Sequence, residues 1–297
     1  MISSPETACT CLLNRGPLFG EVLFMNEIIK EEIFYTVKKK RFIVLAALAI
    51  LGIPVITLMT KNNYWNDLTY YLAIQKYLFY VFGPAVGTAL IISVYRKKYT
   101  RNSIIQVEEF KVKRPVGVLA RVISGAIILA VCYAVAMLVV LLLGLIFGAN
   151  LSIVQTGELA LRMAMDCLGC IVTYTAALFW LYLFAFPIVS VLVYLVLMIA
   201  VPYVYQFFNL YVYGYYKYVC YFVPKALTDH IYSNLVLKNM NWLNALILLL
   251  QIAVYYLLTI LVFKFKKKDK KKRKKKSQPE ETETVVNTAP APAEAGA

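Results

Sequence analysis

One stretch of fifty residues contains no Asp, Glu, Lys, Arg or His: Cys167–Tyr216, CLGCIVTYTAALFWLYLFAFPIVSVLVYLVLMIAVPYVYQFFNLYVYGYY. As one helix it would be about 75 Å long, whereas the hydrocarbon core of a bilayer is about 30 Å thick. The stretch therefore has room for two membrane-spanning helices, and Pro187 and Pro202 are the residues that can divide it. The sequence predicts an integral membrane protein.

Apolar runs of about twenty residues recur along the rest of the chain, and counting them predicts an all-α, polytopic protein with six transmembrane helices. A Gly83-Pro84 break falls inside the second run, and we expect a very tight turn near Pro187 between the fourth and the fifth. The predicted spans are Phe42–Met59, Tyr77–Val94, Val118–Phe147, Met163–Phe186, Ile188–Phe207 and Trp242–Phe263.

The chain before the first span divides at Met25. Residues 1–24 lack the basic start and apolar core of a signal peptide, and we interpret them as a leader or a mis-annotated start. From Met25, apolar and charged residues alternate with helical spacing, which predicts an N-terminal amphipathic helix lying on the membrane surface. The apolar residues of one face are Ile29, Ile33, Phe34 and Val37.

The formal net charge of +15 is concentrated beside the apolar runs, and Lys264–Lys276 alone holds eleven of the 31 basic residues. This placement argues against nucleic acid as a partner. With six spans, one side of the membrane receives 24 Lys and Arg residues counted from Met25, and the other receives 6. The positive-inside rule then predicts a cell-membrane protein with both termini in the cytoplasm.

The C-terminal part, residues 265–297, is interpreted as a polybasic stop-transfer segment followed by a disordered tail rich in Pro, Ala, Glu and Thr. Binding of the lysine run to anionic lipid is the alternative interpretation.

The sequence carries no recognisable catalytic motif, and we expect neither enzyme activity nor a bound cofactor or metal. It has no P-loop, and its single histidine, His230, excludes a multi-histidine metal site. Cys167 and Cys170 have C-x-x-C spacing but lie in an apolar span, which favours small core residues. Asp166 is the only acidic residue inside a predicted span, and we interpret it as an interfacial pair with Arg162.

The cytoplasmic loop Tyr95–Gly117 contains a short predicted helix. Ser103 to Gln106 fits a capping box, the apolar residues Ile104 and Ile105 follow the cap, and Pro115 closes the segment. Two interpretations remain open: a docking element for a partner protein, or a helix that lies on lipid.

The predicted outer segment Phe208–Asn241 and the end of the fifth span are rich in tyrosine. Tyrosines gather at membrane interfaces because they are amphipathic, and they also suit a pathway for amphipathic or sugar-bearing cargo. The candidate substrate-lining residues are Tyr205, Tyr211, Tyr213 and Tyr215.

Taken in order, these features resemble the ABC-2 type permeases, the membrane subunits of ATP-binding-cassette exporters. The resemblance covers about Met25–Lys264. It includes Phe222–Leu227 (FVPKAL), similar to a proline-bearing outer stretch of the family, and Thr100–Arg121 (TRNSIIQVEEFKVKRPVGVLAR), similar to its coupling segment.

The resemblance implies a permease subunit that forms the membrane pathway for export, while a separate ATPase subunit binds and hydrolyses ATP. It also implies a coupling helix that docks into that ATPase, and its candidate residues are Asn102, Ser103, Ile104, Ile105, Glu108, Glu109 and Phe110.

We expect a second copy or a homologous permease subunit to complete the pathway. We expect the pathway to run between the two subunits along spans two and five, where Gly83, Pro84, Gly87 and Pro202 let backbones approach or bend. The alternative function is a non-transporting membrane scaffold or assembly protein with a polybasic cytoplasmic tail.

Overall fold

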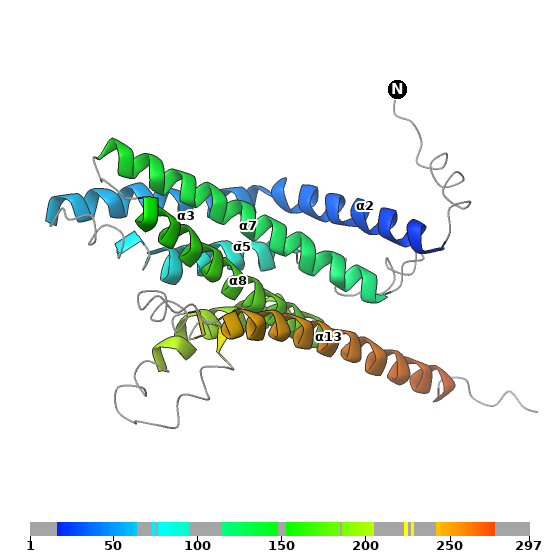
Figure 1. Ribbon diagram of the computed structural model, residues 1–297. Coiled ribbons are helices and arrows are strands. Elements are labelled where there is room, and N and C mark those ends of the chain that lie inside the picture. Colours follow the sequence, from blue (N-terminus) through cyan, green and yellow to red (C-terminus); the bar gives the residue numbers. More distant parts are fainter. Residues whose placement is uncertain are drawn as a thin grey trace, which may run out of the picture.

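The computed structural model describes residues 17–63, 73–74, 77–94, 114–147, 153–184, 186–204, 223–224, 227–228 and 242–276. Within these ranges the structure is helical and contains no strand. Figure 1 shows α2 and α3 following one another, α7 running alongside both, and α8 crossing from this group to α13. The elements are α2 (Pro17–Val37), α3 (Lys40–Asn63), η1 (Leu78–Phe82), α5 (Gly83–Val94), α7 (Arg114–Ile146), α8 (Ile153–Phe184), α9 (Pro187–Leu195), η2 (Val196–Ala200) and α13 (Trp242–Lys276).

Helices occur at all six predicted spans, and five are long and apolar enough to cross a membrane. These five fit a membrane-embedded protein. The second predicted span differs, because its apolar helix Tyr80–Val94 is too short to count among the crossing helices. Five of the six predicted spans therefore coincide with helices that could cross a membrane, and the count of six stays a prediction.

Two π-helical turns interrupt the second and fifth spans, and each stands at the same distance before a proline. In η1 the Gly83 N–H bonds to the Leu78 carbonyl, ahead of Pro84. In η2 the Val201 N–H bonds to the Val196 carbonyl, ahead of Pro202. Proline has no N–H, and its ring clashes with the carbonyl four residues earlier, so a wider turn relieves that contact. The predicted break at Gly83-Pro84 takes this form.

Helix α8 ends at Phe184 and α9 begins at Pro187, with an extended Phe186 directly before it. Phe186 has φ −115° and ψ 120°, and Pro187 is the first residue of α9. A residue before proline is driven from the helical region by the proline ring, whereas proline itself suits the first turn of a helix. The Ser190 hydroxyl donates to the Ala177 carbonyl at 2.6 Å and so ties α9 to α8. The predicted tight turn at Pro187 is confirmed.

The N-terminal helix α2 begins earlier than predicted, at Pro17, so the boundary predicted at Met25 falls inside a helix. From Met25 to Val37, where burial is described, Ile29 and Thr36 are buried, whereas Phe34 and Val37 of the predicted apolar face are 57% and 45% exposed. Helix α2 packs along α7 (Figure 1). Its placement on a membrane surface stays a prediction.

Tyrosines inserted against glycines hold the helices together. A Cβ added to Gly52 of α3, Gly87 of α5 or Gly125 of α7 would overlap the ring end of a tyrosine from another part of the chain. The three tyrosines are Tyr77, Tyr194 and Tyr174, respectively. Glycine leaves a notch in a helix surface, and a tyrosine fills it while its hydroxyl can reach the backbone. Two of them do so: the Tyr77 hydroxyl donates to the Ala49 carbonyl at 2.6 Å, and that of Tyr194 to the Gly83 carbonyl at 3.0 Å.

The helices differ in how much apolar surface they bury. The apolar part of α8 is 61% buried, whereas in the other four long apolar helices this share is between 17% and 28%. Helix α8 therefore forms the centre of the bundle. The outward faces of α3, α7 and α13 carry rows of exposed Leu, Ile and Val, as expected for surfaces in contact with lipid tails or with another membrane protein.

Candidate functional site

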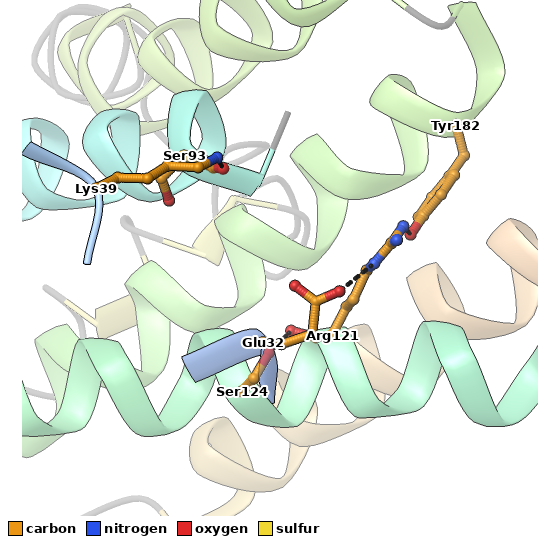
Figure 2. A network of polar contacts seen from close by, with 6 residues as sticks. All are labelled: Glu32, Lys39, Ser93, Arg121, Ser124 and Tyr182. Carbon is orange, nitrogen blue, oxygen red and sulfur yellow. Dashed lines mark hydrogen bonds and ion pairs between the residues drawn. The ribbon is translucent and has the colours of Figure 1, made fainter. Parts of the chain in front are cut away.

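A buried ion pair joins the N-terminal helix to the bundle. The Arg121 Nε of α7 donates to a Glu32 carboxylate oxygen of α2 at 3.4 Å, and Arg121 also donates to the hydroxyl of Tyr182 in α8 (Figure 2). The side chains of Arg121 and Glu32 are only 10% and 16% exposed. Charges removed from water need partners, and here each charge has the other as its partner. One arginine thus connects three helices.

A second polar contact lies at the joint between α2 and α3. The Lys39 ammonium group donates to the Ser93 carbonyl near the end of α5 (Figure 2). Carbonyls in the last turn of a helix have no intrahelical donor, so a lysine from another helix supplies one. This contact fixes the end of α5 against the start of α3.

These contacts bring several helix ends to one end of the bundle. The Lys39 contact connects the joint between α2 and α3 with the end of α5, and the Arg121 contacts connect α2 with the start of α7 and the end of α8. The start of α7 also meets α13, because the Tyr256 hydroxyl donates to the Pro115 carbonyl at 3.2 Å. Basic sequence clusters lie at the same helix ends: Lys38–Arg41, Lys111–Arg114 and, after the apolar part of α13, Lys264–Lys276.

A second buried cluster lies around the π-turn of the second span. The Tyr133 hydroxyl and the Cys170 thiol are 3.1 Å apart, and both would meet a Cβ added to Gly83. The Tyr133 ring packs edge-on against Phe82, with centroids 5.2 Å apart. All of these side chains are buried, so the cluster packs α5 against α7 and α8.

The two cysteines of the C-x-x-C pattern are buried thiols, at 8% exposure for Cys167 and 1% for Cys170. The interpretation as small core residues is confirmed. Among the described residues, no group of His, Cys, Asp and Glu side chains is arranged to hold a metal ion. Asp166, placed by the sequence at the membrane interface, is only 3% exposed and belongs to the buried face of α8.

Glycine and proline residues predicted to face a second subunit are used inside the chain. Gly83, Pro84 and Gly87 are buried residues of α5, and Tyr194 of α9 fills the notch at Gly87. Pro202 is buried as well. Tyr194 of the same chain fills the place beside Gly87 that a neighbouring backbone would need, so this glycine serves packing within the subunit. The course of a pathway between two subunits stays a prediction.

Both groups of functional residues predicted from the sequence lie outside the described residues. This holds for the coupling-helix candidates Asn102–Phe110 and for the tyrosines 205, 211, 213 and 215. Part of the proline-bearing outer stretch is described: Val223, Pro224 and Leu227 are buried, and Leu227 packs with Met165 and Val172 of α8 and Leu248 of α13.

No protein-family model matches the sequence, and a comparison with curated proteins finds no match.

The pairing of Glu32 with Arg121 was not predicted from the sequence. A signal for it exists, because both are charged residues beside long apolar runs, where an unpaired charge is costly. The choice of partner across 89 positions depends on how α2 lies against α7.

Proposed function

We propose that the chain is the permease subunit of an ATP-driven exporter of the ABC-2 type, forming the membrane pathway while a separate P-loop ATPase supplies the energy. The single observation that supports this most is that both helices flanking segment 95–113, α5 and α7, are held in place by the N-terminal part of the chain. Its preceding helix is held by Lys39 at Ser93, and its following helix by Glu32 at Arg121. A loop that transmits force needs fixed ends, and both ends are tied here to one N-terminal element.

The proposed contact with the ATPase is the helix Asn102–Phe110. Ile104 and Ile105 serve as apolar anchors, and Glu108 and Glu109 lie at the rim. Burial of two isoleucines contributes roughly 3–6 kcal/mol before the cost of association, which is a large share for a small joint. The basic clusters at the same end of the bundle support a cytoplasmic position for this loop.

Changing Ile104 and Ile105 together to Asp should abolish co-purification of the ATPase and ATP-driven transport. The wild type and the matched double change to Leu should retain both, because leucine keeps the apolar contact. The measurement is ATP hydrolysis and transport by the full-length protein co-purified and reconstituted in vesicles. If the wild type co-purifies with no P-loop ATPase, or if the Asp variant transports normally, the proposal is wrong and a membrane scaffold becomes the better interpretation.

We further propose that two permease subunits enclose the pathway. The described interior of one bundle is filled by fully buried side chains such as Tyr174, Tyr194 and Phe82, which favours a pathway between subunits. This proposal does not depend on contact through the glycines of spans two and five.

Native mass spectrometry of the gently extracted complex should give two permease subunits for each pair of ATPases, because paired ATPases need two docking helices. A complex with a single permease subunit that remains active in vesicles would contradict this stoichiometry.

A further inference from the structure

Helix α3 carries a continuous exposed apolar stripe. Val44, Leu48, Leu51 and Val55 are between 52% and 60% exposed, whereas Phe42, Ala46, Ala49 and Ile53 on the other side are buried. The exposed residues follow one another at alternating intervals of four and three, which places them on one face of the helix. In a membrane this face meets lipid tails.

The same spacing continues backward from Val44 through Arg41 and Val37 to Phe34, across the joint between the two helices. All three of these residues are exposed. Figure 1 shows α2 and α3 following one another nearly in line. The lipid-facing stripe of α3 therefore runs into a basic and aromatic surface, which we call the joint patch: Phe34, Tyr35, Lys38, Lys40 and Arg41.

The charges of the joint patch are of one sign. Lys38, Lys40 and Arg41 are exposed, whereas Lys39 is half-buried and directed to the Ser93 carbonyl. The Lys38 ammonium lies 3.9 Å from the centre of the Phe34 ring. From Ile33 to Asn63 the chain contains no Asp or Glu, so no acidic residue of this segment offsets the three cations. Cations and exposed aromatic rings at the end of an apolar stripe are typical of the headgroup layer of a membrane.

We propose that the joint patch binds the headgroup phosphate of an anionic phospholipid whose acyl chains lie along the exposed stripe of α3. The three cations supply the charge complement to the phosphate, and Phe34 and Tyr35 lie at the level of the glycerol backbone. This site does not depend on the proposed transport function, because it needs only that α3 crosses the bilayer.

The test uses the full-length protein in vesicles that contain a photoreactive phosphatidylglycerol or a photoreactive phosphatidylcholine with the same acyl chains. Adducts are mapped by mass spectrometry to peptides of α3, and adducts at the end of α13 serve as an internal reference. One basic residue near an anionic surface strengthens binding about fivefold. The triple variant Lys38→Gln, Lys40→Gln, Arg41→Gln should therefore bind the anionic lipid about a hundredfold more weakly. We expect the α3 adducts of this variant to fall to the phosphatidylcholine level.

Lys30→Gln is the matched control, because Lys30 is an exposed cation on α2 farther from the α3 stripe, and its adduct yield should equal that of the wild type. Should the triple variant fail to insert, Arg41→Gln alone should still lower the yield about fivefold. Equal labelling by both lipids, or an unchanged yield in these variants, would overturn the proposal. Excess inorganic phosphate should leave the yield unchanged; if it abolishes the adducts, the site takes a free anion and not a lipid.

Discussion

Replacement of Gly87 by Ala should destabilise the bundle by about 3 kcal/mol, at the upper end of the cost of overpacking a core. The added methyl group would overlap the hydroxyl end of the Tyr194 ring. That ring cannot move aside easily, because it is fully buried and its hydroxyl donates to the Gly83 carbonyl. The free energy of unfolding, measured by SDS titration in mixed micelles, checks this prediction.

Gly157→Ala provides the matched control, because nothing lies within 4 Å of a Cβ added at Gly157. Alanine is the better helix former, so this change should be neutral or stabilise the protein by up to about 1 kcal/mol. Removal of the tyrosine ring by Tyr194→Leu should reduce the penalty of Gly87→Ala, since residues in contact are energetically coupled. Equal effects at Gly87 and Gly157 would contradict the notch arrangement.

Glu32→Gln should destabilise the protein by about 3 kcal/mol, because it removes the carboxylate that pairs with the largely buried Arg121 guanidinium. Glu31→Gln, one residue away on the exposed side of α2, should change the free energy of unfolding by less than about 0.5 kcal/mol. The same SDS titration compares the two variants at equal charge change.

A double variant separates the loss of the pair from the burial of one uncompensated charge. Glu32→Met together with Arg121→Leu should cost less than either single change, because it leaves no buried charge behind. If Glu32→Gln and Glu31→Gln have the same small effect, the ion pair does not hold α2 on α7.

The positions of the helices follow largely from local properties of the chain. The lengths of the apolar runs and the proline at 187 were sufficient to place the helices, because a bilayer demands a minimum length and proline restricts the residue before it. Some ends differ: α8 begins at Ile153 and not at Met163, and α13 continues past Phe263 to Lys276. The short helix of the second span was mispredicted for a related reason: Pro84 changes the hydrogen-bonding pattern ahead of it, and composition alone does not reveal how many residues stay α-helical.

The contacts between helices were the harder part. Small residues in spans two and five indicated close packing, but the sequence did not indicate that Tyr194 of the same chain would occupy the notch at Gly87. The packing of α2 on α7 was not predicted either. Its periodicity indicates an apolar face, whereas the contact with α7 buries Ile29 and Thr36 and includes Glu32. Which face is buried depends on the partner helix and not on periodicity alone.

The joint at Phe186 has a consequence for biogenesis. With α8 ending at Phe184, α9 beginning at Pro187, and Ser190 bonded back to Ala177, the two helices form a closed hairpin. Such a hairpin offers the insertion machinery no polar loop at which the first helix could be released before the second is made. The two helices should therefore leave the translocon laterally as one unit.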